Sequence, residues 1–67
     1  MLSAYDLSLG CVQIRERGPV RVSLWREHGV YQIRAHEFDG RGRLAWTTAR
    51  SLREANRTFA SMVSLYL

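Results

Sequence analysis

Turn signals that contain glycine divide this chain into short runs in which apolar and polar residues alternate. The signals are Gly18-Pro19, His28-Gly29 and Asp39-Gly40, the last followed by Arg41-Gly42. Short turns of this kind join antiparallel neighbours, and an alternation of period two turns one face of each strand to a core and the other to water. The pattern therefore predicts an antiparallel β-meander with strands at about 12–17, 20–27, 30–38 and 43–49.

The alternation also predicts which side chains face the core. In the first run Val12 and Ile14 are expected inside, with Gln13, Arg15 and Arg17 outside. The later runs are expected to add to the inner face Val20, Val22, Leu24, Tyr31, Ile33, Ala35, Leu44 and Trp46. Upstream, the alternation of Tyr5, Leu7 and Leu9 changes phase at Gly10, which predicts either a fifth strand or a β-bulge.

The hydrophobic period changes after residue 50. Ser51 and Glu54 have the spacing of a capping box, in which the serine caps the first turn of a helix. Apolar residues then recur at helical spacing, at Leu52, Ala55, Phe59, Met62, Val63 and Tyr66. A helix at about 52–66 is expected to cover the apolar face of the sheet, because no other segment can do so. In that interface Phe59 is expected to meet Trp46.

These elements predict an α+β fold in a single small domain, residues 1–67. Four antiparallel strands, or five with the N-terminal segment, would pack against one C-terminal amphipathic helix. Leu65 and Leu67 lie off the apolar stripe of that helix. Because a small domain gains stability by pairing such surface, we expect a homodimer formed through the C-terminal helix.

Composition narrows the class of protein. Cys11 is the single cysteine, which argues against a disulfide scaffold and favours a reducing cytoplasm. Neither a signal peptide nor an apolar run long enough to cross a membrane is apparent, so a cytoplasmic protein without a membrane partner is expected. The formal net charge is +4, and arginine supplies all ten basic residues. Guanidinium groups pair bidentately with phosphates and carboxylates, which favours an anionic partner.

Catalytic and metal chemistry have little support in the sequence. Cys11 and His36 are the nucleophile–base combination that the sequence offers, and no local motif surrounds either. Cys11 is better explained as a small buried hydrophobe. These two residues and His28 lack the spacing of metal ligands, and Glu37 with Asp39 fits a strand end and a turn. We therefore expect a protein that is not an enzyme and has no cofactor or metal.

Basic and aromatic side chains gather on the predicted outer face of the sheet. Arginines on neighbouring strands repel one another unless carboxylates intervene or an anion binds. Glu16, Glu27 and Glu37 could make this a solvated, salt-bridged face. Alternatively, the arginines contact phosphates while Trp25 and Gln32 stack on bases or contact their edges. The candidate binding residues are Arg15, Arg17, Arg21, Trp25, Gln32, Arg34, His36, Arg41 and Arg43.

The stretch from Val20 to Val63 resembles a known family. Its recognisable segments are Gly29-Val30-Tyr31-Gln32-Ile33-Arg34, Asp39-Gly40-Arg41-Gly42-Arg43, Trp46-Thr47-Thr48, and Ser51-Leu52-Arg53-Glu54-Ala55 with Phe59. Their order is similar to that in the AP2-like, arm-type DNA-binding domains at the N-termini of phage integrases. Such domains pack a three-stranded meander on a C-terminal helix and read DNA from the sheet. Those domains are normally fused to a recombinase, whereas this chain starts with methionine and stops after its helix. The resemblance therefore implies an accessory or regulatory DNA-binding protein.

A second hypothesis, that the protein is an inhibitor, is based on its small size and its composition. Very small, cysteine-poor proteins with a compact sheet and helix are typical of phage and mobile-element accessory genes, including anti-CRISPR inhibitors. A protein of that kind would dock its arginine face on an acidic surface of a host protein or nucleoprotein complex. Phosphate binding predicts a steep salt dependence, whereas docking on a protein depends on a few central residues.

Overall fold

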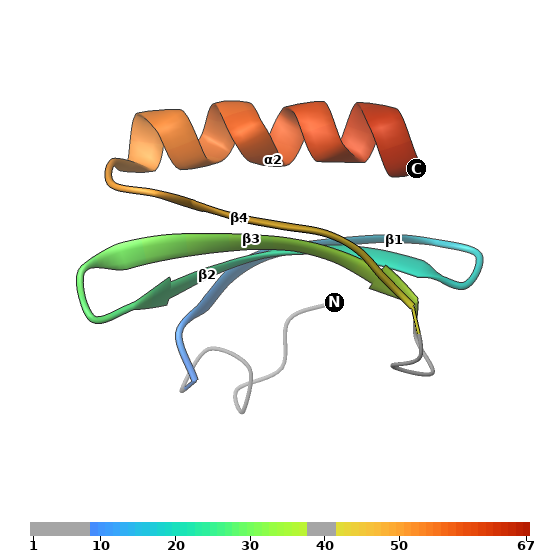
Figure 1. Cartoon of the computed structure of the whole chain (residues 1–67), viewed down its shortest axis with the longest axis horizontal. Helices are drawn as coiled ribbons and strands as arrows, with labels where there is room; N and C mark the ends of the chain where they lie inside the picture. The colour runs from blue at the N-terminus through green and yellow to red at the C-terminus, as the bar shows by residue number, and fades with distance from the viewer. Residues whose placement is uncertain (1–8, 38–41) are drawn as a thin grey trace.

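The structure, a computed structural model, describes residues 9–37 and 42–67. Its elements are β1 (Cys11–Arg17), β2 (Val20–Glu27), β3 (Val30–Glu37), β4 (Arg43–Ala49) and α2 (Leu52–Tyr66). The strands form one antiparallel sheet in the order β1-β2-β3-β4, and α2 lies across one face of it (Figure 1). The predicted α+β meander with a C-terminal helix is confirmed. Among the described residues, the predicted bounds differ only at the first residue of β1.

Two-residue turns connect the first three strands, as the sequence predicts. His28 and Gly29 have φ angles of 51° and 77°. Positive φ at both central positions is the requirement of a type I′ turn, whose twist matches that of the strands it joins. Of the third predicted turn, residues 39–41 lie outside the described residues, as do position 38 and the expected N-terminal strand before Leu9. The carbonyl of Gly42 accepts a hydrogen bond from the amide of Glu37 at 2.9 Å.

Helix α2 closes the core over β2 and β3 and, to a smaller extent, over β4. The predicted cap is present, since the Ser51 hydroxyl accepts a hydrogen bond from the Glu54 amide at 3.2 Å. The core consists of Val22, Leu24, Ile33, Ala35, Ala49, Ala55, Phe59 and Met62. Within the described part of the chain no helix is long and apolar enough to cross a bilayer.

Phe59 is buried as predicted, but the expected contact with Trp46 is wrong. Trp46 pairs with Arg34, whose neighbours in β3 face α2, so the indole lies on the side of the sheet away from the helix and is 48% exposed. Ala45 and Ala49 occupy the helix side of β4 instead. Small side chains there let α2 approach the sheet closely, and an indole in their place would hold it away.

Two further leucines were predicted to lie in the core, and both lie outside it. Leu44 is 40% exposed and lies where the pairing of β3 with β4 shifts, so it has no cross-strand partner. Leu52 begins α2 at the edge of the apolar stripe and is 47% exposed. At the other end of the helix Leu65 is exposed as expected, whereas Leu67 packs against the core.

Strand β1 faces the opposite way from the prediction. Gln13 pairs with Leu24 and Arg15 with Val22, so both lie on the helix side, and Ile14 lies on the other. The register shifts between Cys11 and Gln13, just after the phase change seen at Gly10 in the sequence. Because α2 packs on the other strands, the helix side of this edge strand stays open to water and tolerates polar residues.

Candidate functional site

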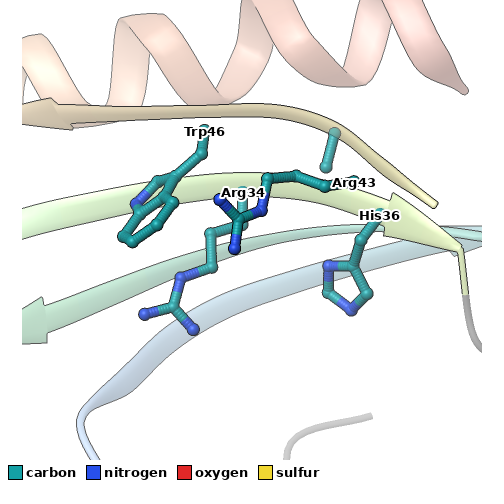
Figure 2. A pocket seen from close by; sticks show the side chains of 5 residues that line it. Arg34, His36, Arg43 and Trp46 are labelled. Carbon is teal, nitrogen blue, oxygen red and sulfur yellow. The ribbon is translucent and has the colours of Figure 1, made fainter. Parts of the chain in front are cut away.

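The face of the sheet opposite α2, here called the outer face, presents side chains in rows that run across the strands. The cationic row is Arg21, His36 and Arg43, one residue each from β2, β3 and β4. The next row along the strands, the stacking row, is Ser23, Arg34 and Trp46. The third row is Trp25, Gln32 and Thr48. Figure 2 shows His36, Arg43, Arg34 and Trp46 on the side away from the helix.

The arginines and tryptophans of these rows stack in alternation. The Cζ atom of Arg34 lies 5.5 Å from the centroid of the Trp25 ring and 5.4 Å from that of Trp46. The Cζ atom of Arg43 lies 4.6 Å from the Trp46 centroid. At exposed sites each cation–π contact contributes about 0.5–1 kcal/mol. The planar guanidinium groups thus hold both indoles in a series that runs from β2 to β4.

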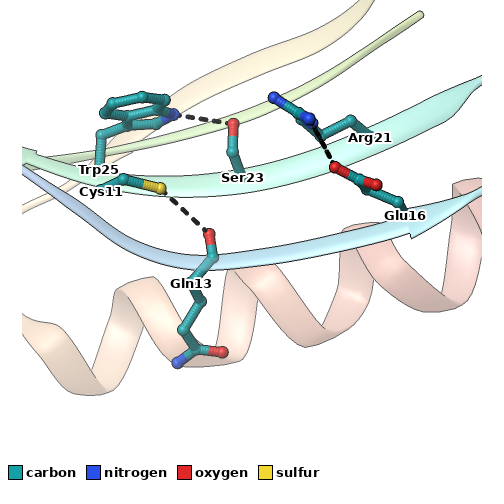
Figure 3. A network of polar contacts seen from close by, with 6 residues as sticks. All are labelled: Cys11, Gln13, Glu16, Arg21, Ser23 and Trp25. Carbon is teal, nitrogen blue, oxygen red and sulfur yellow. Dashed lines mark hydrogen bonds and ion pairs between the residues drawn. The ribbon is translucent and has the colours of Figure 1, made fainter. Parts of the chain in front are cut away.

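A buried serine anchors the first indole. Trp25 Nε1 donates a hydrogen bond to Ser23 Oγ at 2.8 Å, and Ser23 is fully buried (Figure 3). Cys11 is buried as predicted. It lies in register with Trp25, on the outer side of β1. Trp25 is therefore fixed in the sheet surface, and the more exposed Trp46 is the indole with free ring area.

Carboxylates neutralise two of the outer arginines. Arg21 Nη2 lies 2.6 Å from Glu16 Oε1. Arg34 Nη2 donates to Gln32 Oε1 at 2.6 Å and lies 3.6 Å from Glu27 Oε1, while Gln32 Nε2 donates to Glu27 Oε2 at 3.1 Å. Ion pairs at the surface, as these partly exposed ones are, contribute little stability, at most about 1 kcal/mol. They orient the guanidinium groups and leave both arginines at the surface.

Arg43 differs from these two arginines. Over residues 9–37 and 42–67, no carboxylate pairs with it, and its guanidinium stacks on Trp46. It borders a pocket of about 380 Å³ that is lined by Arg34, Ala35, His36, Arg43 and Trp46. Among these lining residues there are two arginines, one histidine and no acidic side chain, so Arg43 adds positive charge beside an exposed indole.

His36, in the middle of the cationic row, has a lowered pKa. Burial, and then the charges of Arg21 and Arg34, lower the pKa of His36 below its ordinary value of 6.5. The free protein therefore holds this imidazole neutral near pH 7. A neutral imidazole donates a hydrogen bond from one ring nitrogen and accepts one at the other. An anion in the pocket would favour protonation of the ring.

The structure brings together six of the nine predicted site residues, namely Arg21, Trp25, Gln32, Arg34, His36 and Arg43. Arg15 and Arg17 were predicted on the same face, and this is wrong, because β1 faces the other way. Arg17 Nη1 instead donates to the main-chain oxygen of Leu67 at 2.8 Å. Arg15 borders a separate pocket of about 360 Å³ between β1 and α2. Arg41 lies outside the described residues.

Trp46 is the site residue that the sequence prediction missed. It was assigned to the core because tryptophan is apolar and alternates with Leu44. The contrary signal was the set of small residues at Ala45, Thr47 and Ala49, which form the opposite face of the same strand. Small residues on a strand suit close packing under a helix, so the bulky indole belongs on the other side.

No group of three or more histidine, cysteine, aspartate or glutamate side chains is arranged to hold a metal ion among the residues that the structure describes. What the outer face offers is a fixed surface of guanidinium groups and aromatic rings. Comparison of the chain with protein-family models, curated proteins and solved structures finds no match, so the geometry of this face is the basis for assigning a function.

Proposed function

We propose that this protein binds nucleic acid through its outer face and performs no chemistry on it. The observation that supports this most directly is the pocket in which Arg34, His36 and Arg43 surround the exposed Trp46 ring, with no carboxylate among the described residues that line it. Positive charge that follows a backbone, combined with an aromatic ring for bases, is how sequence-tolerant nucleic-acid sites are built.

The arrangement of the basic side chains suits a polymer better than a small anion. Neighbouring strands lie about 4.8 Å apart, so the cationic row extends roughly 10 Å across β2, β3 and β4. A phosphate backbone laid across the strands would meet Arg21, then His36, then Arg43. Arginine is the preferred partner for such contacts because its planar fork binds phosphate oxygens in pairs.

A purely structural role accounts less well for the same residues. The Nε atom of Arg34 is buried and lacks a hydrogen-bond partner within the described residues. An unsatisfied buried donor costs about 1–3 kcal/mol. The exposed indole of Trp46 adds apolar surface that water does not favour. Both features are costs for a surface that only solvates the sheet, and the exposed indole is the one that a bound ligand would cover.

The resemblance of residues 20–63 to arm-type DNA-binding domains agrees with this proposal, since those domains also use a sheet face. The corrected facing of β1 changes which residues take part. Arg15 and Arg17 leave the proposed site and Trp46 enters it. An accessory or regulatory protein of a phage or mobile element would need only this binding function.

The test is a fluorescence anisotropy titration of labelled single-stranded DNA, single-stranded RNA and duplex DNA at low and physiological salt. Arg43→Ala and Arg15→Ala form a matched pair, because both remove one exposed arginine but from opposite faces. Arg43→Ala is expected to weaken binding and reduce the salt slope by about one. Arg15→Ala should keep the wild-type slope.

Failure to bind any of these nucleic acids at low salt would overturn the proposal. The same arginines would then be better explained by docking on an acidic surface of a host protein, as an inhibitor of the anti-CRISPR type does. Equal losses in Arg43→Ala and Arg15→Ala would indicate unspecific attraction to a basic protein and would also count against a site on the outer face.

A further inference from the structure

The Trp46 ring is placed to accept a base, and this bears on the kind of nucleic acid that fits. We infer that the outer face takes a single-stranded segment, with one unpaired base stacked on Trp46 and its phosphate on the cationic row. This inference rests on the proposed function and specifies the ligand of the same site.

The first step concerns the open area of the ring. Trp46 is 48% exposed even though Arg34 and Arg43 both lie against it. Among the described strands, β4 is at the edge of the sheet and has no neighbour on its far side. A base can therefore reach the indole from the solvent side. It can also take the place of the Arg43 guanidinium, which no carboxylate in the described residues holds and which is then available to a phosphate.

The second step is the spacing of the rows. Trp46 lies in the stacking row, and the cationic row is displaced from it along the strands by two residues, roughly 7 Å. In a nucleotide the sugar separates the base from the phosphate. A base on Trp46 thus leaves its phosphate on the side of His36 and Arg43, so one nucleotide can use both rows at once.

The third step is the size and shape of the site. The pocket beside Trp46 is about 380 Å³, near the lower end of the roughly 300–1,000 Å³ of small-molecule pockets. Such a volume suits a single nucleotide. Sheet faces that recognise single-stranded RNA likewise stack two or three splayed bases on aromatic side chains. The half-buried Trp25, on the same face two strands away, offers a second ring to a neighbouring base.

A closed duplex cannot use the same features. Its bases are stacked on one another, so none presents a free ring face to Trp46. The outer face is also four strands wide, about 14 Å between the axes of its edge strands, against a major groove of about 12 Å. A duplex would be limited to phosphate contacts with the cationic row.

The experiment compares three probes on the whole chain by anisotropy at one low salt concentration. They are an oligothymidylate, an abasic oligonucleotide of the same length and charge, and a duplex. The wild type should bind the oligothymidylate more tightly than the abasic strand or the duplex. Trp46→Leu should weaken oligothymidylate binding by roughly 5- to 150-fold, equivalent to about 1–3 kcal/mol for one stacked base. It should leave abasic binding unchanged.

Trp46→Phe keeps an aromatic face and should recover part of the lost affinity. Because Trp46 lies outside the core, both variants should keep the circular dichroism spectrum of the wild type. Equal wild-type affinities for the oligothymidylate and the abasic strand would overturn the inference, and so would equal losses on both in Trp46→Leu. In either case the phosphate-binding proposal survives. Absence of binding to all three probes would overturn the inference and the proposed function together.

Discussion

Phe59 is the largest side chain that α2 buries, and it connects the helix to the sheet. It is 5% exposed and belongs to one cluster with Val22, Leu24 and Ile33. Replacing it with alanine removes the ring from this cluster and leaves a cavity, because the surrounding strands are tied by their hydrogen bonds and relax only in part. The expected loss in the free energy of unfolding is about 3–5 kcal/mol.

The size of the chain sets how severe that loss is. Native proteins are stable by roughly 0.05–0.15 kcal/mol per residue, which gives about 3–10 kcal/mol for a chain of 67 residues. Phe59→Ala is therefore expected to leave the protein largely unfolded, or with a small fraction of its stability. A truncation on the exposed side of the same helix should have little effect.

The assay is urea unfolding followed by circular dichroism, with Leu65→Ala as the matched control. Leu65 also lies on α2 but is 73% exposed. The control should stay within about 0.5 kcal/mol of the wild type. A midpoint for Phe59→Ala that matches the wild type would refute the packing of α2 on the sheet. A control that unfolds as readily as Phe59→Ala would show that a different face of the helix is buried.

Four other expectations can be measured in the same way or by light scattering. Gly10→Ala should cost about 1–3 kcal/mol, since φ is +95° and a Cβ atom there would collide with the backbone of β2, whereas Gly18→Ala, which faces open space, should cost less in the same urea titration. Ser51→Ala should cost about 0.5–2 kcal/mol through loss of the helix cap, and a melt identical to the wild type would contradict this. The lowered pKa of His36 means that the unfolded chain binds more protons, so stability should fall as pH drops through about 6.5, and this loss should be smaller in His36→Gln. Our proposal of a homodimer through α2 predicts a mass that rises with concentration in the wild type and stays monomeric in Leu65→Ser.

Much of the fold could be predicted because its signals are local. Glycine turns, alternation of period two and the Ser51 cap each depend on residues adjacent in the chain, and they determine where the strands and the helix begin and end. The inward residues of β2 and β3 were also predicted correctly. These two strands are central in the sheet and lie under the helix, so a single apolar face has to be buried.

The facing of the edge strands β1 and β4 was predicted wrongly, because it depends on how each strand pairs with a neighbour and not on the local sequence alone. Each edge strand has one shift in register, near Val12 in β1 and at Leu44 in β4, and such a shift reverses the facing of the residues on one side of it. The local pattern does not show where a bulge falls. Arg15 was placed on the outer face, and Trp46 was placed in the core because its apolar character was given more weight than the small residues on the other face of β4, so the candidate site was only partly correct.

The proposed binding site lies on the outer face and not in the groove between β1 and α2. The most direct measurement is a proton–nitrogen NMR titration with a short single-stranded oligonucleotide, which reports on both places in one spectrum. We expect the indole N–H signals of Trp25 and Trp46 to shift. The side-chain amide signals of Gln13 and Asn56, which hydrogen-bond to each other across the groove at 3.1 Å, should stay in place. Shifts confined to Gln13 and Asn56, with both indole signals unmoved, would contradict it.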